Sequence, residues 1–145
     1  MTRGYWRNLT PAPSIDKEGA PLAGVGIFVV EDDPDARRAT CAALKAWGSV
    51  VVEAASAPEA LQAFAAILPS VVVTDLGLPD LDGTWLLRQI RQLPPDKGGR
   101  VPVVAFSAYF QRRERELIRA AGFEDLISKP IDPYEFRGAI AKLLS

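Results

Sequence analysis

The sequence predicts an α/β fold in which a five-stranded parallel sheet is covered by helices on both faces. Short apolar runs such as residues 27–30 and 71–73 alternate five times with segments of helical periodicity, which is typical of right-handed βαβ units. These two runs contain no polar residue, as expected for strands buried on both faces. Two strand orders fit five such units, the flavodoxin-like order 2-1-3-4-5 and a half-Rossmann order.

Composition and charge narrow the class of protein. The chain has 145 residues, enough for one ordinary domain, with 17 basic and 18 acidic residues. It has no histidine, which excludes histidine-based catalysis, most zinc sites and the histidine side of a phosphorelay. The single cysteine, Cys41, is expected to be an inert packing thiol in a reducing compartment. No apolar run approaches ~20 residues and no secretory signal is visible, so we expect a cytoplasmic protein without a membrane partner.

The N-terminal segment differs from the rest of the chain. It contains Pro11, Pro13 and Pro21 and shows neither helical nor alternating apolar periodicity. We therefore predict a flexible tail or linker over residues 1–24 and one folded domain over residues 25–145.

The first half of this domain shows clear boundaries. The strand at 27–30 is followed by Asp33 and Pro34, which are typical of a helix cap and first helical position, and Gly48 ends this helix. A second strand is predicted at 50–52. Next, residues 56–59 (Ser-Ala-Pro-Glu) have the capping-box pattern and begin a second helix.

The second half repeats the alternation. After the strand at 71–75, Asp82 is expected to cap a third helix, and a long loop over 94–100 leads to a strand at 101–107 with Pro102 near its start. A charged helix follows at about 111–121. The last two elements are a short strand at 126–128 and a helix capped by Asp132.

Chemically useful side chains follow four of the five strands. Glu31 and Asp32 follow the first, Asp75 the third, Ser107 the fourth and Lys129 the fifth. Ligands bind at the carboxyl ends of the strands in open α/β sheets, so these groups are expected to converge. Glu31, Asp32 and Asp33 stand where a dinucleotide site would need a glycine-rich turn, and their carboxylates would repel a pyrophosphate. Hard oxygen donors without nitrogen or sulfur favour Mg²⁺, with Mn²⁺ as an alternative.

Four motifs carry a resemblance to a known family. They are VVEDD at 29–33, VVVTDLGLPDLDG at 71–83, VVAFSA at 103–108 and SKP at 128–130. In this order and at these strand ends, they resemble the receiver domain of two-component response regulators over residues 25–145. The resemblance implies the flavodoxin-like order 2-1-3-4-5, which the family exemplifies.

The resemblance also implies roles for individual residues. Asp75 is the expected phosphoacceptor. The metal is expected on the carboxylates of Asp32 and Asp75 and the backbone carbonyl of Gly77, with Glu31 supporting it largely through bound water. Ser107 and Lys129 are expected to hold the phosphoryl oxygens. The implied function is a phosphorelay module, phosphorylated on Asp75 by a sensor histidine kinase or histidine phosphotransfer protein. It would catalyse only its own phosphorylation and dephosphorylation, carry no attached output domain and act on a downstream protein that the sequence does not identify.

Two positions depart from the family pattern. Leu126 stands where many receivers have an aromatic residue that turns inward on activation. Without this aromatic side chain, the sequence does not show how phosphorylation would be coupled to the partner-binding face. Gly77 offers no side chain to orient an attacking water, so we hypothesise a relatively long-lived phosphoryl group.

Alternative functions remain open at the level of sequence. One is a Mg²⁺-dependent phosphohydrolase with an aspartyl nucleophile, although Gly77 stands where that chemistry needs a general acid. Another is a receiver-like scaffold that is never phosphorylated. The arginine-rich helix at 111–121 is interpreted as a solvated, ion-paired surface, not a nucleic-acid site, because its charges alternate in sign. A stand-alone regulator and the receiver of a hybrid kinase both fit the sequence.

Overall fold

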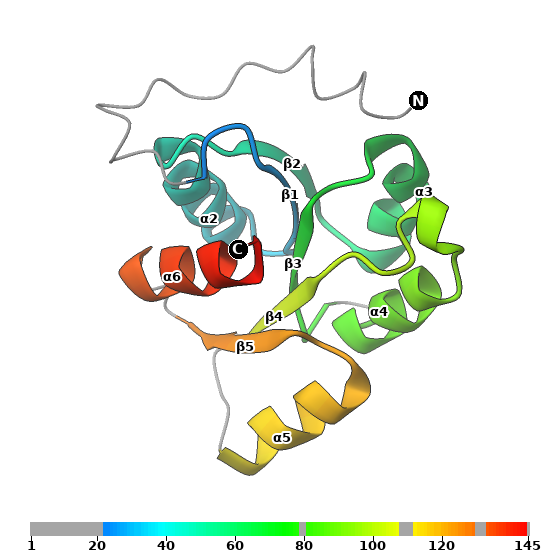
Figure 1. The fold of residues 1–145 in the computed structure, drawn as a ribbon. Coiled ribbons are helices and arrows are strands. Elements are labelled where there is room, and N and C mark those ends of the chain that lie inside the picture. The colour runs from blue at the N-terminus through cyan, green and yellow to red at the C-terminus, as the bar shows by residue number, and fades with distance from the viewer. Residues whose placement is uncertain (1–21, 79–80, 108–111, 130–132, 145) are drawn as a thin grey trace.

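The computed structural model contains one five-stranded parallel sheet with the order β2-β1-β3-β4-β5 (Figure 1). It describes residues 22–78, 81–107, 112–129 and 133–144. The predicted fold class and the flavodoxin-like strand order are therefore confirmed. With this order β2 and β5 are the edge strands, and β3 lies in the middle of the sheet between β1 and β4.

The strands are short and begin within two residues of the predicted positions. Their bounds are β1 Gly26–Val30, β2 Val50–Ala54, β3 Val71–Asp75, β4 Val103–Ser107 and β5 Asp125–Ser128. The prediction for β4 was two residues too long at its start. The amide of Val101 bonds to the carbonyl of Gly98 in the preceding turn, and Pro102 has no amide hydrogen to offer the sheet.

The helices are α2 Pro34–Ala46, α3 Ala57–Ile67, α4 Gly83–Arg91, α5 Arg112–Ala121 and α6 Pro133–Leu144. Three predicted caps are confirmed. Asp33, Ser56 and Asp82 each accept a hydrogen bond from the backbone amide three residues ahead, at 2.9–3.2 Å. The predicted cap Asp132 lies outside the described residues. The predicted loop at 94–100 contains a single 3₁₀ turn, Pro95–Lys97.

The capping box at the start of α3 differs in one bond. Glu59 does not return to the amide of Ser56, as the pattern predicts, but accepts from the amide of Ala55 at 3.2 Å. The longer reach is possible because Ser56 has extended backbone angles, which place the preceding amide within range.

Helices cover both faces of the sheet. The helices α3, α4 and α5 lie on one side, and α2 and α6 lie on the other (Figure 1). Each side has its own core: Phe28, Phe64 and Leu126 belong to the first, and Leu44 and Phe106 to the second. Every residue of β1 is buried, and so are the first four residues of β3. A rigid sheet therefore presents the groups at its carboxyl edge.

The segment just before β1 also belongs to the folded part. Leu22 is 1% exposed, and its amide donates to the carbonyl of Trp47 at 3.0 Å, while Gly24 bonds to Gly48. These residues fell within the predicted tail, but they fill the space beside the turn between α2 and β2. Residues 1–21 of the predicted tail lie outside the described residues.

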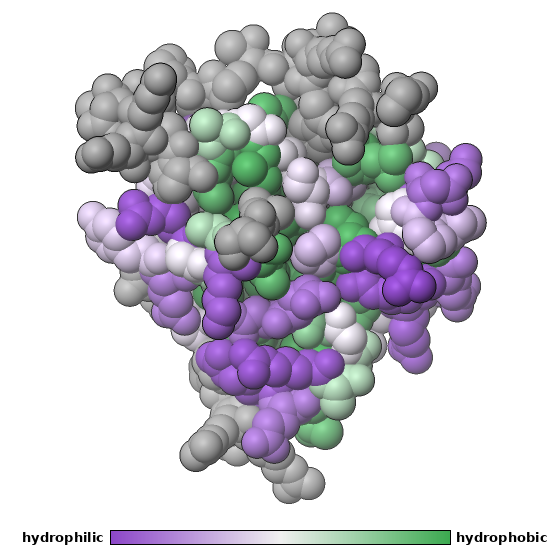
Figure 2. All heavy atoms as spheres, viewed as in Figure 1, coloured by the Kyte–Doolittle hydropathy of each residue, from purple (hydrophilic) through white to green (hydrophobic). Residues whose placement is uncertain are grey.

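Hydrophilic and hydrophobic residues are unevenly distributed on the face shown in Figure 2. In Figure 2 hydrophobic residues show mostly near the centre of the view, and hydrophilic residues gather over the region of β5 and α5. There Arg115 and Arg119 both reach Asp125, at 3.5 and 3.3 Å, so at least part of the arginine-rich helix is ion-paired as interpreted. Among the described residues, no helix combines the length and the apolar character needed to cross a membrane.

Candidate functional site

Three of the predicted residues meet at the carboxyl edge of the sheet. Glu31 directly follows β1, Asp75 is the last residue of β3, and Lys129 directly follows β5. The parallel register places the ends of these strands level with one another, since Val30 is opposite Thr74 and Ser107 is opposite Ser128. Side chains separated by up to 98 positions in the sequence are thus brought into contact.

Lys129 links the carboxylates of Glu31 and Asp75. Its Nζ lies 2.5 Å from Oε1 of Glu31 and 2.9 Å from Oδ2 of Asp75. The ammonium also lies over the ring of Phe106, 4.7 Å from its centroid, which adds a favourable cation–π contact. Burial opposes the charged form, but the two carboxylates outweigh it and raise the pKa of Lys129 above its ordinary value. A permanently cationic group therefore lies beside Asp75.

Glu31 is the most deeply placed group of the site, with 0% of its side chain exposed. Its other oxygen, Oε2, accepts from the amide of Asp33 at 3.4 Å. Burial raises the pKa of Glu31 to about 7, with the neighbouring Asp75 acting in the same direction and Lys129 opposing it. The carboxyl group therefore titrates near neutral pH in the absence of a metal ion.

Asp75 has the opposite shift. Burial by itself would raise its pKa, but hydrogen bonds with Glu31, Lys129 and the amide of Gly77 lower it below the usual range. The Gly77 amide donates to Oδ1 at 3.1 Å, and 13% of the Asp75 side chain remains exposed. Asp75 is thus an anion at neutral pH that solvent, and a reactant, can reach.

The donor set fits a hard divalent cation. One carboxylate oxygen from each of Glu31, Asp32 and Asp75 lies within 4.8 Å of the others, and Asp32 is exposed to solvent. No histidine or cysteine belongs to this cluster. Oxygen-only coordination with room for water is what Mg²⁺ prefers in proteins. These three residues could therefore hold the metal that the sequence predicted.

Two further predicted residues have a defined place. Ser107 ends β4, next to β5, and its carbonyl accepts from the amide of Lys129 at 2.7 Å. This bond fixes the start of the chain segment that carries the lysine. Gly77 is tied to Asp75 through its amide, while its predicted role as a carbonyl ligand of the metal stays a prediction.

Sequence reasoning missed three residues that shape the site. Arg37 on α2 donates to the backbone carbonyl of Glu31 at 2.8 Å, and Phe106 lies beneath Lys129. Gly83 packs so closely on β3 that a Cβ atom there would lie 2.5 Å from the carbonyl oxygen of Asp75. Only Gly83 gave a signal, because it directly follows Asp82, the predicted cap of the third helix. The other two depend on tertiary contacts.

Comparison with known proteins agrees with this geometry. Residues 27–141 match the family model of the response regulator receiver domain. A 14.6 kDa protein from Leptolyngbya boryana, described as uncharacterized, is 39% identical over 79% of this chain and 86% of its own length. The transcriptional regulatory protein KdpE of Escherichia coli is 35% identical over 72% of this chain, but only 44% of KdpE is covered. The chain thus spans less than half of that regulator.

Solved structures show the same fold. The receiver domain of a sensor histidine kinase from Pseudomonas aeruginosa, described with a magnesium ion coordinated in its active-site cleft, is 30% identical, with a TM-score of 0.75 over 85% of this chain and 100% of that one. A receiver domain protein from Methanospirillum hungatei is 28% identical, with a TM-score of 0.71 over 82% of this chain and 93% of that one. The chain therefore belongs to the response regulator receiver domain family of two-component signalling.

Proposed function

We propose that this receiver domain accepts a phosphoryl group on Asp75 from the phosphohistidine of a sensor histidine kinase or histidine phosphotransfer protein. The observation that carries the proposal is the contact of Lys129 with Asp75 at 2.9 Å, beside two further carboxylates. A reachable carboxylate with a lowered pKa is a competent nucleophile, and the adjacent ammonium can stabilise the charge of the phosphoryl oxygens.

The reaction is an in-line phosphoryl transfer. An oxygen of Asp75 forms a bond to phosphorus as the phosphorus–nitrogen bond breaks, and the electron pair of that bond stays on the imidazole of the donor. A bound Mg²⁺, held by Glu31, Asp32, Asp75 and the Gly77 carbonyl, would neutralise charge on the phosphoryl oxygens. After the transfer, the Lys129 ammonium would contact the oxygens of the phosphoryl group on Asp75. The Ser107 hydroxyl would donate a hydrogen bond to another of these oxygens.

This chemistry gives the domain a signalling role. The donor protein supplies the substrate, so the domain acts only on its own Asp75 and on the acyl phosphate formed there. Movement of Lys129 toward the phosphoryl group would loosen its 2.5 Å contact with Glu31 and pull on the end of β4 through the backbone bond to Ser107. A downstream protein would respond to that change.

The direct test is phosphorylation by a small donor. The protein is incubated with acetyl phosphate and Mg²⁺, and its intact mass is measured with and without the metal. We expect one added phosphoryl group in the wild type and none in Asp75→Asn. Asp96→Asn removes an exposed carboxylate from the distant 3₁₀ turn and should be phosphorylated like the wild type. A wild-type protein that takes up no phosphoryl group would contradict the proposal and favour an unphosphorylated scaffold.

A further inference from the structure

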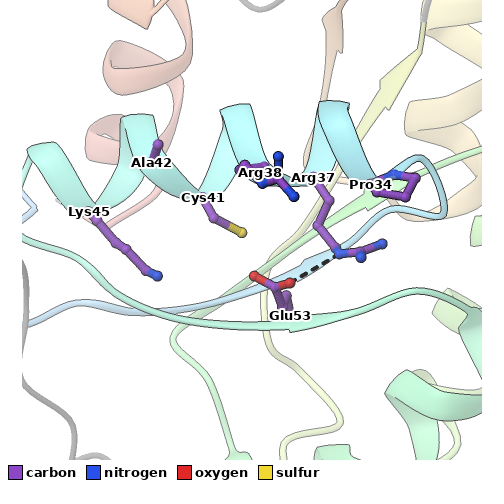
Figure 3. Close-up of a pocket in the computed structure, with 7 residues that line it drawn as sticks. All are labelled: Pro34, Arg37, Arg38, Cys41, Ala42, Lys45 and Glu53. Carbon is purple, nitrogen blue, oxygen red and sulfur yellow. Dashed lines mark hydrogen bonds and ion pairs between the residues drawn. The ribbon is translucent and has the colours of Figure 1, made fainter.

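Arg37 is a side chain of α2 that reaches the backbone of the site from outside it. It lies in the second turn of the helix and extends across to the edge strand β2 (Figure 3). Its Nε donates to Oε1 of Glu53 at 3.1 Å, and its Nη1 donates to the backbone carbonyl of Glu31 at 2.8 Å. The planar guanidinium thus joins the residue that follows β1 to a side chain on β2.

These bonds fix the peptide that precedes Asp32. The amide of Glu31 donates to the carbonyl of Ala54 at 3.0 Å, so the amide side of this residue is tied to β2. Its carbonyl is tied to β2 as well, through Arg37 and Glu53. That carbonyl belongs to the peptide bond between Glu31 and Asp32, and its direction decides where the backbone carries both carboxylates.

The surroundings of Arg37 show that its bond to the Glu31 carbonyl is more than part of a surface ion pair. Together with Glu53 it borders a cavity of about 260 Å³ between α2 and β2, which is also lined by Arg38, Cys41 and Lys45 (Figure 3). The side chain of Glu53 is 49% exposed, so its ion pair contributes little to stability by itself. Arg37 is only 19% exposed, and its bond to the Glu31 carbonyl is charge-assisted and partly buried.

We propose that Arg37 is a positioning residue for the metal-binding carboxylates, and that Glu53 holds Arg37 in place. The inference rests on the proposed function, because it assigns Arg37 a part in preparing Glu31 and Asp32 for Mg²⁺. Groups that orient metal ligands contribute strongly to affinity although they never touch the metal. Arg37 itself does not contact the metal, the phosphoryl group or Asp75.

The test compares two neighbouring arginines. Arg37→Met and Arg38→Met each remove one positive charge from the same cavity, but among the described residues Arg38 makes no hydrogen bond or ion pair. Any long-range effect of charge on Mg²⁺ binding is therefore similar in both. We expect the Kd for Mg²⁺, measured by titration calorimetry, to rise about tenfold in Arg37→Met and to stay close to the wild-type value in Arg38→Met.

A second readout follows the backbone directly. Amide hydrogen exchange over residues 31–36 should become faster in Arg37→Met without metal, while exchange in β3 and β4 stays slow. Arg37→Lys should not restore Mg²⁺ affinity, because one ammonium cannot span both acceptors in place of the guanidinium. Glu53→Gln, which preserves an acceptor of the same shape, should give an intermediate Kd, and it replaces Arg37→Met if that variant is unstable.

The outcomes separate this inference from the proposed function. Equal Kd values for Arg37→Met and Arg38→Met, or full rescue by Arg37→Lys, would overturn the positioning role. A wild type that binds Mg²⁺ but accepts no phosphoryl group would contradict the proposed function, while the comparison of the two variants would still decide the role of Arg37. A wild type without Mg²⁺ affinity would contradict both.

Discussion

The two loops that bring carboxylates to the site are held in different ways. The loop after β1 delivers Glu31 and Asp32, and long polar side chains fix it from outside, since Arg37 binds its backbone and Lys129 binds Glu31. In the described part of the loop after β3, Leu76 follows Asp75 directly, and both pack backbone against backbone on Gly83 at the start of α4. The first depends on long side chains that reach it across the sheet, whereas the second has local backbone hydrogen bonds and a close contact that leaves no room for a side chain at Gly83.

This difference predicts different sensitivities. A polar contact can lengthen or be replaced by water, so a loop held in this way loses its geometry gradually. A backbone contact that leaves no room for a methyl group cannot adjust without moving the chain. We therefore expect the loop after β3 to be the less tolerant of the two, and the predictions below test this from the largest effect to the smallest.

The largest effect is expected for Gly83→Ala. Its added methyl group would lie 2.5 Å from the carbonyl oxygen of Asp75 and 3.3 Å from Cα of Leu76, so the start of α4 or the end of β3 must shift. Forcing atoms into a well-packed place should lower the free energy of unfolding by about 2 kcal/mol, measured by urea denaturation. The affinity for Mg²⁺ should fall as well, because Asp75 moves.

The matched control for this prediction is Gly77→Ala. A Cβ atom at Gly77 meets no described residue within 4 Å, so this nearby glycine, which precedes α4, should accept a methyl group with little change in stability. Equal destabilisation by the two substitutions would show that the close approach at Gly83 is not what fixes this loop.

The second prediction uses the opposite pKa shifts of Glu31 and Asp75, one carboxyl group from each loop. Burial raises the pKa of Glu31 to about 7, whereas Asp75 has its pKa lowered. Mg²⁺ needs the deprotonated Glu31, so affinity should rise with pH through 7 and be about tenfold weaker at pH 6 than at pH 8. Calorimetric titration at both pH values measures this, and equal affinities would contradict it.

The same shift has a consequence for stability without metal. A carboxyl group whose pKa rises from 4.5 in the unfolded chain to about 7 in the fold stabilises the protein while it is protonated. This contribution is complete below pH 4.5 and is lost as the pH rises through 7. Addition of Mg²⁺ should offset the loss above pH 7, where the ion binds the folded state.

A smaller, kinetic effect is predicted for Gly77→Asn. Among the described residues, none lies within 4 Å of a Cβ atom placed at Gly77, and the amide of an asparagine there could hold a water molecule near the phosphoryl group on Asp75. We expect the acyl phosphate to hydrolyse several-fold faster than in the wild type. The hydrolysis is measured as the loss of the phosphoryl mass over time after the donor is removed. An unchanged lifetime, or a lifetime of seconds in the wild type, would count against the hypothesis of a long-lived phosphoryl group.

The smallest effect is expected for the reactivity of Cys41, which lines the same cavity as Arg37. Burial raises the pKa of its thiol to about 12, so the native protein should resist alkylation by iodoacetamide at pH 8 and react fully in urea. If Arg37 fixes the loop and not the whole of α2, Arg37→Met should leave Cys41 protected. Rapid alkylation of that variant would instead show that the helix has detached from β2.

The sequence predicted the fold and most of the site for a physical reason. Apolar runs separated by caps and glycines specify strands and helices locally, and the parallel arrangement then brings all strand ends to one edge. Glu31, Asp75 and Lys129 each adjoin a strand end, so their meeting could be expected before their distances were known. The bounds of β4 were less predictable, because they depend on how the turn around Gly98 binds Val101.

Only the tertiary structure decided how these groups affect one another. The local sequence gives Glu31 and Asp75 the same chemistry, but burial raises one pKa and hydrogen bonds lower the other. Arg37 and Arg38 are adjacent and chemically identical, yet Arg37 binds the backbone of Glu31 and Arg38 is exposed. Periodicity and capping act between residues near in the chain and can be read from it. Burial, charge pairing and close packing depend on neighbours that only folding brings together.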